Sequence, residues 1–333
     1  MFVLGMLLAI CMLVGACSSL QVAKLPVPPK YPDRPITLIV PFSAGGGIDL
    51  VARAMEKVAP KYLGQALVVV NKPGGTGSIG WNELVTANPD GYTIGISSIE
   101  LLLNPLYGAT KYNYPTALEP LAQVANSPSM MVVLADQPWQ DVSSLIDYGK
   151  QHPGQLKFSH PGIGSLSHII GEEFSRMTDS GLVQVPFRGG GESIAALLGG
   201  HVQIAFVSPA LVKEHVKSGK VKALAVLSER HLDDPVFAQV ATFKEQNINI
   251  AVNNWFGVAA PKELPVEIKN KLGEAFKLTI ADEEFRTLVE NMGVQVEYLN
   301  PSQSASQWKS DSQKLNKTVK ETGILDLIKA QKQ

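Results

Sequence analysis

Cysteine is nearly missing from this chain of 333 residues, which contains only Cys11 and Cys17. Both lie ahead of every strand and helix that the sequence predicts. Without a further cysteine, the folded part has no disulfide and no reactive thiol, which excludes cysteine catalysis and thiolate-bound metal. An excess of positive charge is missing as well, since the formal net charge is −1. Nucleic acid, which needs a basic face, is therefore not an expected partner.

Enzyme signatures are also missing. The chain has no Gly-x-x-x-x-Gly-Lys-Ser/Thr loop, and the glycines at 45–47 lack the spacing of a dinucleotide fingerprint. Neither a nucleophile elbow nor a zinc-binding helix occurs. His160 and His168 lie eight residues apart, but no carboxylate cluster accompanies them, so we expect His168 to cap or pack at a helix. We predict that the protein is not an enzyme and binds neither cofactor nor metal.

Long hydrophobic runs are missing except at the N-terminus. Residues 2–16 are apolar and uncharged, which is shorter than the roughly 20 residues of a membrane span but typical of a signal peptide. Small residues then precede Cys17, and residues 14–17 are similar to a bacterial lipobox. We expect residues 1–16 to be a lipoprotein signal peptide and Cys17 to be the lipid anchor of a protein exported to the periplasm or cell surface. The alternative is a plain signal peptide or a short anchor, because no Lys or Arg precedes the run.

A Ser- and Pro-rich stretch follows the anchor. We expect residues 17–30 to form an extended tether between the membrane and the first strand.

The most informative stretch is Ile36 to Ala54. Residues 36–40 are apolar and rich in β-branched side chains, which predicts a strand buried on both faces. Residues 45–47 are three glycines, which leave no side chain between the backbone and a ligand. The next residues are apolar at helical spacing. The pattern predicts a strand, a glycine turn and a helix whose first N–H groups form an anion site.

A second copy of this pattern occurs about one domain length later. Residues 40–47 (VPFSAGGG) are echoed by residues 185–191 (VPFRGGG), again between an apolar run and a helical pattern. Two units of one design favour two lobes that present similar loops to one cleft. The alternative is that both are ordinary strand-to-helix turns, in which glycine is frequent.

Predicted strands alternate with predicted helices along most of the chain. This alternation indicates α/β lobes, each with a mostly parallel sheet flanked by helices. Residues 253–261 are expected to return the chain to the first lobe. We therefore predict one lobe from residues 31–127 and 254–333 and another from residues 128–253, with the ligand cleft between them.

Six segments resemble the receptors of tripartite tricarboxylate transporters, the TctC or Bug-type substrate-binding proteins. They follow the expected order over residues 31 to about 300: YPDRPITLIVPFSAGGGIDLVAR, VVVNKPGGTGSIG, NPDGYTIG, HPGIGSLSHI, VPFRGGGESIAALLGGHV and NNWFGVAAP. The resemblance implies a two-lobed periplasmic-binding-protein fold, similar to type II, with two chain crossovers. It also implies capture of a small carboxylate for a separate membrane permease. Ile48 and Phe187-Arg188 depart from residues that are common in the family.

The candidate site residues share one position, the carboxyl end of a predicted strand, where ligands bind in open α/β sheets. Backbone N–H groups there would bind a carboxylate through charge-assisted hydrogen bonds. The candidates are Phe42, Ser43, Ala44, Gly45, Gly46, Gly47, Asp49, Ser97, Ser98, Gly162, Ile163, Gly164, Ser165, Arg188, Gly189, Gly190, Gly191 and Ser208.

Several of these assignments leave an alternative open. Asp49 either satisfies helix N–H groups or contacts a ligand ammonium or hydroxyl. Glu100 and Glu192 share this ambiguity, and the structural role is favoured. Arg188 either pairs with the ligand or lies solvated at the lip of the cleft. The protein is expected to be a monomer, and its role also has an alternative. A transport receptor and a ligand-sensing lipoprotein that acts on a signalling partner would use the same cleft.

Overall fold

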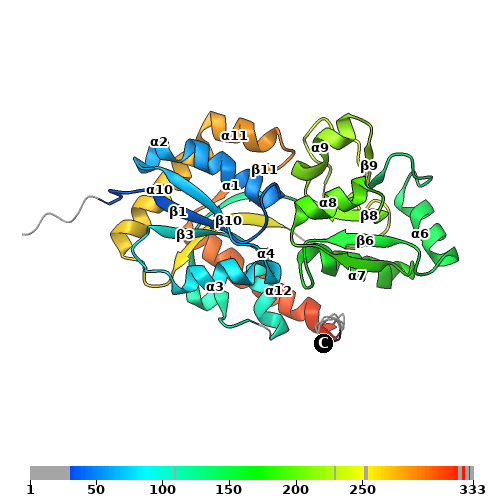
Figure 1. The fold of residues 1–333 in the computed structure, drawn as a ribbon, viewed down its shortest axis with the longest axis horizontal. Helices are drawn as coiled ribbons and strands as arrows, with labels where there is room; N and C mark the ends of the chain where they lie inside the picture. Colours follow the sequence, from blue (N-terminus) through cyan, green and yellow to red (C-terminus); the bar gives the residue numbers. More distant parts are fainter. Residues whose placement is uncertain are drawn as a thin grey trace, which may run out of the picture.

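The computed structural model of the protein describes residues 31–108, 110–228, 230–250, 254–321, 325–326 and 330. The predicted signal peptide, Cys17 and the tether lie outside these residues. Two sheets, each covered by helices, lie side by side (Figure 1). We call each sheet with its helices a lobe.

The first lobe is built on a six-stranded sheet in the order β11-β4-β10-β3-β1-β2. Strands β1 to β4 run in one direction, and β10 and β11 run against them. Most strands therefore share one direction, as predicted, and the later strands make the sheet mixed. The strands are β1 (Ile36–Val40), β2 (Leu67–Asn71), β3 (Thr93–Ser98), β4 (Leu118–Asn126), β10 (Trp255–Pro261) and β11 (Gln295–Leu299).

The second lobe is built on a five-stranded sheet in the order β7-β6-β8-β5-β9. Only β5 runs against its neighbours. Its strands are β5 (Met130–Leu134), β6 (Lys157–His160), β7 (Val183–Pro186), β8 (Ile204–Val207) and β9 (Val221–Val226).

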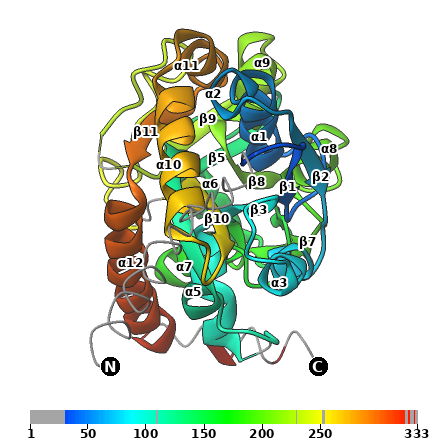
Figure 2. The same cartoon turned by 90° about the vertical axis from the view of Figure 1, so that its left-hand side faces the viewer.

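Helices cover both faces of each sheet. Figure 2 looks from the first lobe and shows α1 and α11 above its strands, with α3 and α12 below. The first lobe contains α1 (Gly47–Val58), α2 (Pro60–Leu63), α3 (Ser78–Thr86), α4 (Ile99–Leu103), α5 (Tyr114–Ala117), α10 (Val266–Ala281), α11 (Glu283–Glu290) and α12 (Pro301–Glu321), with 3-10 turns at Gly75–Gly77 and Asn104–Tyr107. The second contains α6 (Val142–Gln151), α7 (Leu166–Thr178), α8 (Gly190–Leu198) and α9 (Pro209–Lys217).

The burial of β1 explains its central place. Its residues alternate between two apolar layers: Leu38 and Val40 pack with α1, whereas Ile39 packs with the layer that contains Trp81 of α3. All three side chains are at most 1% exposed. The prediction of a strand buried on both faces is confirmed, because apolar side chains at every position except Thr37 suit a strand with a helix layer on each side.

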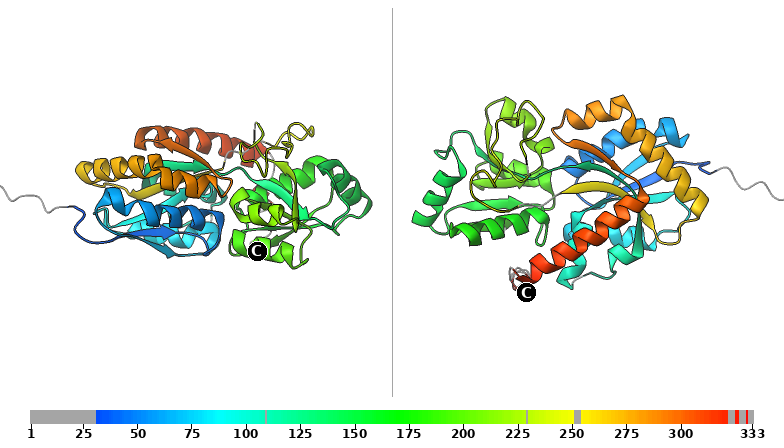
Figure 3. Two further views of the ribbon diagram at one scale, coloured as in Figure 1. Left: turned by 90° about the horizontal axis from the view of Figure 1, so that it is seen from above. Right: turned by 180° about the vertical axis from the view of Figure 1, so that it is seen from behind.

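The chain passes between the sheets twice. It leaves the first sheet at the end of β4 and enters the second at β5, and it returns between β9 and β10 (Figure 3). At the first passage, Ser127 donates to or accepts from Ser208 Oγ of the second lobe at 2.6 Å. The predicted residue limits of the lobes stay a prediction.

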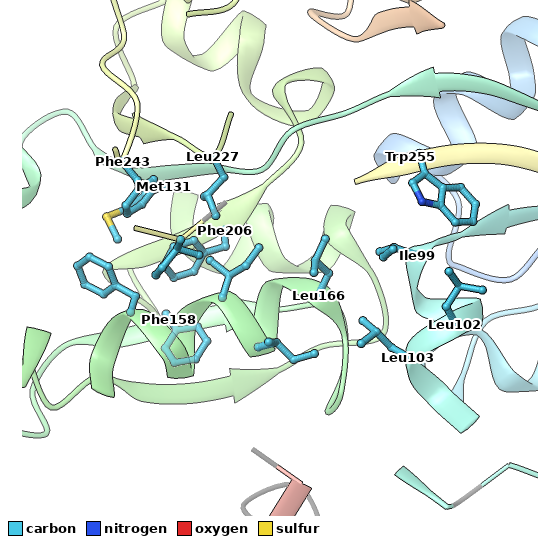
Figure 4. Packing of buried hydrophobic residues seen from close by; sticks show 14 of the residues in the cluster. Ile99, Leu102, Leu103, Met131, Phe158, Leu166, Phe206, Leu227, Phe243 and Trp255 are labelled. Carbon is cyan, nitrogen blue, oxygen red and sulfur yellow. The ribbon is translucent and has the colours of Figure 1, made fainter. Parts of the chain in front are cut away.

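One apolar cluster continues from lobe to lobe. Figure 4 shows Ile99, Leu102, Leu103 and Trp255 on the side of the first lobe, and Phe158, Phe206 and Phe243 on the side of the second. Leu166, the first residue of α7, lies between these groups and is 2% exposed. The two lobes are therefore in close apolar contact in this structure.

Candidate functional site

The loop between β1 and α1 is held by Asp49. The buried Asp49 carboxylate accepts hydrogen bonds from the Gly45 N–H at 2.9 Å and from Asn71 Nδ2 at 2.8 Å. Arg53 Nε lies 3.4 Å from the same carboxylate. Gly45 has a φ of +78°, a conformation that glycine adopts without strain. The contacts of Asp49 thus shape the loop, which agrees with the structural alternative.

The two glycine loops meet directly. A Cβ atom built on Gly46 would lie 3.4 Å from the Ser43 carbonyl oxygen and 4.0 Å from the Gly190 nitrogen in the other lobe. One built on Gly191 would lie 3.6 Å from the Ala44 carbonyl oxygen, and one on Gly189 would clash with Ser43 Oγ. The glycines therefore allow the backbones of opposite lobes to approach closely.

A small cavity lies where these loops meet. We call it the inner cavity; its volume is about 70 Å³. It is lined by Phe42, Gly46, Gly47, Ile48, Glu100, Ser129, Pro161, Ser167, Gly190, Phe206, Val207, Ser208, Leu211, Asn254 and Phe256. Both lobes contribute, and no Lys, Arg or His is among these lining residues.

Four helix N-termini converge on the inner cavity. Gly46 and Gly47 begin α1, Gly190 begins α8, Ser208 caps α9, and Ser167 lies in the first turn of α7. The first N–H groups of each helix have no partner within the helix, and the helix dipole makes these ends electropositive. The cavity can therefore bind an anion without a cationic side chain.

A larger space opens beside the inner cavity. We call it the outer hollow; its volume is about 340 Å³, and it is lined by Gly74, Gly75, Thr76, Ser78, Asn104, Thr110, Pro161, Gly162, Ile163, Phe187 and Arg188. Thr76 Oγ1 donates to the Ile163 carbonyl oxygen at 2.8 Å and so joins the lobes here. Arg188 is exposed, and its backbone N–H donates to Glu192 Oε2 at 3.1 Å. This places Arg188 at the lip and gives Glu192 a structural contact.

Other predicted residues lie near the inner cavity without lining it. Ser97 and Ser98 are fully buried, and Ser98 Oγ donates to Glu100 Oε2 at 2.6 Å. Ser165 caps α7 by accepting from the His168 N–H at 3.2 Å. A Cβ atom on Gly164 would lie 2.7 Å from the Tyr107 ring.

The two histidines pack together beneath this loop. Their rings stack with centroids 4.5 Å apart. His168 Nδ1 accepts from the Gly164 N–H at 3.1 Å, and His160 Nδ1 lies 2.8 Å from the Gly162 carbonyl oxygen. Burial, together with the neighbouring His168, lowers the pKa of His160 to about 4. Among the described residues, no group of three or more His, Cys, Asp or Glu side chains is arranged to hold a metal ion.

Glu100 is not among the candidate site residues, and the sequence favoured a structural role for it. It is 6% exposed and lines the inner cavity, and burial raises the pKa of its carboxyl group. The sequence predicted the neighbouring Ser97 and Ser98 as ligand-binding residues because they end a strand. The side chain that reaches the cavity is two residues further on, at the start of α4.

The family of this chain follows from the comparisons with known proteins. The family model described as "Tripartite tricarboxylate transporter family receptor" matches residues 51–324. The chain belongs to this receptor family. It is similar to the "UPF0065 protein in gbd 5'region" of Cupriavidus necator, with 32% identity over 96% of this chain and 97% of that protein.

Solved structures of similar proteins agree with this membership. One is the periplasmic binding protein BugD, with a TM-score of 0.84, 29% identity, and 88% of this chain and 99% of that chain covered. Another is MatC of Rhodopseudomonas palustris with bound malate, with a TM-score of 0.81 and 26% identity. The match covers 87% of this chain and 100% of MatC. The predicted TctC/Bug resemblance and two-lobed fold are confirmed, and the tripartite tricarboxylate receptors are binding proteins rather than enzymes. In the part of the chain that the structure describes, no helix is long and apolar enough to cross a membrane.

Proposed function

We propose that this receptor captures a small carboxylate between its lobes and delivers it to the membrane permease of a tripartite transporter. The observation that carries the proposal is the convergence of four helix N-termini, from both lobes, on one inner cavity. Each hydrogen bond to a charged group contributes about 1.5–3 kcal/mol. Membership of the receptor family and the malate bound to MatC support the same ligand class.

Binding proceeds by closure of the lobes. The inner cavity has a volume of about 70 Å³ and is lined by residues of both lobes, so a ligand bound there contacts both lobes. The ligand then bridges N–H groups that belong to different lobes, and its binding energy favours the closed arrangement. The chain crosses between the lobes near residues 128 and 253, and these crossings are the places proposed for the hinge. The lobes proposed are residues 31–127 with 254–333, and residues 128–253.

Export is part of the proposal. Residues 1–16 would direct secretion, Cys17 would carry the lipid, and residues 17–30 would tether a monomeric receptor to the membrane. The family of periplasmic receptors supports export.

A ligand screen tests capture. Protein beginning at Ser18 is heated with mono-, di- and tricarboxylates, and the hit is titrated by calorimetry. We expect at least one carboxylate to raise Tm by several degrees, because ligand at 100 times Kd stabilises the fold by about 2.7 kcal/mol. No shift with any carboxylate would overturn capture.

Delivery needs a separate test in cells. Deletion of this receptor should abolish uptake of the carboxylate found in the screen, and the intact chain should restore it. Unchanged uptake, with ligand binding confirmed, would favour a sensing role instead.

A further inference from the structure

Glu100 is an acidic side chain inside a cavity built for an anion. It is the second residue of α4, is 6% exposed, and lines the inner cavity with Gly46, Gly47 and Gly190. Its Oε2 accepts from Ser98 Oγ at 2.6 Å, and its Oε1 accepts from the Leu166 N–H of the opposite lobe at 3.4 Å. The second contact is long and therefore weak, and the backbone N–H of Glu100 itself is a third donor to the carboxylate.

The Glu100 carboxylate has no counter-charge in this structure. Within the described residues, no Lys, Arg or His forms an ion pair with it, whereas Asp49, the other buried acid near the loops, lies 3.4 Å from Arg53 Nε. A buried carboxylate without a cation is unfavourable because burial removes its hydration. Burial accordingly raises the pKa of Glu100. A cation delivered by a ligand would relieve this penalty.

A second acceptor lies on the same cavity. Asn254 lines it, and its Oδ1 is buried with no hydrogen-bond donor among the described residues. The inner cavity thus combines helix N-termini, which bind an anion, with two acceptors, which bind N–H groups. Because its volume is only about 70 Å³, one small ligand can reach both kinds of group.

We propose that Glu100 binds a cationic nitrogen of the ligand, so that the receptor prefers a carboxylate that also carries an ammonium group, such as an amino acid. The carboxylate of that ligand lies against the glycine loops, and its ammonium donates to Glu100 and Asn254 Oδ1. This inference rests on the proposed capture of a carboxylate and specifies which carboxylates are preferred. It assigns Glu100 the role of a specificity-determining residue.

Matched ligand pairs test the preference in the unmodified receptor. Calorimetry compares aspartate with succinate, glutamate with glutarate, and β-alanine with propionate. For a pair of which either member binds, we expect the amino compound to bind about 10-fold or more tightly, since a buried charge-assisted hydrogen bond depends on the ammonium. This measurement uses only the unmodified receptor, so its result does not depend on whether a substituted protein folds.

A charge-removing variant assigns the effect to Glu100. Glu100→Gln keeps the size of the side chain and an acceptor for the Leu166 N–H. We expect the preference within each pair to fall to about one, while the plain carboxylate binds as well as before or more tightly. The matched control is Glu119→Gln, another buried acid of the first lobe, which pairs with Lys269 and does not line the cavity. It should leave the preference unchanged.

Contrary results separate the two proposals. If plain carboxylates bind as tightly as their amino partners, or Glu100→Gln leaves the preference intact, the role of Glu100 is overturned and capture of carboxylates stands. The residue would then serve only as a hydrogen-bonded contact between α4 and α7. If no carboxylate of either kind binds, the proposed function itself fails.

Discussion

Gly46 and Gly190 come from opposite lobes and line the same inner cavity. Gly46 has a φ of −77°, and Gly190 lies in the first turn of α8 without a positive φ, so neither needs glycine for its backbone conformation. A Cβ atom on Gly190 would lie 2.7 Å from Leu211 Cδ1. At both positions, glycine is required because a side chain would fill the space between the backbone and the cavity.

Gly46→Val and Gly190→Val should each abolish stabilisation by the ligand, because the added methyl groups occupy the place of the ligand. The expected loss is the whole stabilisation of about 2.7 kcal/mol at 100 times Kd, measured as the shift in Tm. Gly273→Val is the control, since this glycine of α10 lies outside the cavity and its Cβ would meet Pro301 at 3.5 Å. Circular dichroism checks folding. Folded variants that keep the full shift would show that the two loops do not form the site.

At the scale of elements, the turn between β6 and α7 depends on two stacked histidines. His160 ends β6 and His168 lies in the first turn of α7, and their stacked rings contact the backbone of Gly162 and Gly164 between them. A proton on His160 would place a charge in a buried position beside another histidine. The pKa of His160, about 4, lies below the ordinary value of 6.5 for this reason.

The stability of the protein should therefore fall as the pH falls from about 6.5 to about 4. In this window the unfolded chain binds a proton at His160 that the folded chain does not, which costs on the order of 3 kcal/mol at the lower limit. Burial of Glu100 acts in the opposite direction, because its raised pKa weakens the fold as the pH rises. The test must thus compare variants at each pH.

His160→Gln removes the titrating group. Urea unfolding at several pH values should show that the free energy of unfolding falls less steeply between about pH 6.5 and pH 4 (the acid limb) than in the unmodified protein. His201→Gln, at an exposed position, is the matched control and should keep the original slope. An identical acid limb in His160→Gln would contradict the role of His160.

At the scale of the whole molecule, contacts between the lobes surround the cavity. Thr76 with Ile163, Ser127 with Ser208, and the apolar cluster around Leu166 hold the lobes together. The described chain begins on the first lobe, at the end remote from the second (Figure 1). The predicted tether at residues 17–30 would attach there and would leave the second lobe free to move.

Membrane attachment is predicted to depend on Cys17. Cys17→Ser should release the receptor from the membrane fraction or block its processing, because the thiol that carries the lipid is gone. Cys11→Ser is the control, since Cys11 would leave with the signal peptide. Fractionation and the mass of the mature protein give the readout. Membrane retention and processing that match the unmodified chain would contradict lipid attachment at Cys17.

The local pattern was sufficient to place most elements. The strand at residues 36–40 and both glycine turns before α1 and α8 appear where the sequence predicts them. These features depend on apolar spacing and glycine content within a few residues. The short α4 and α5 were not predicted, because helices of four or five residues have too little periodicity to be distinguished.

By itself, the sequence determined the order of strands, turns and helices and the family to which the chain belongs. The tertiary structure alone decided which polar groups reach the cavity. Asp49 and Ser165 turn to backbone N–H groups of their own loops, whereas Glu100 lines the cavity opposite α7. The direction of such a side chain depends on packing between segments distant in sequence. For Glu100 the decisive neighbour is Leu166, which only the contact between the lobes brings close.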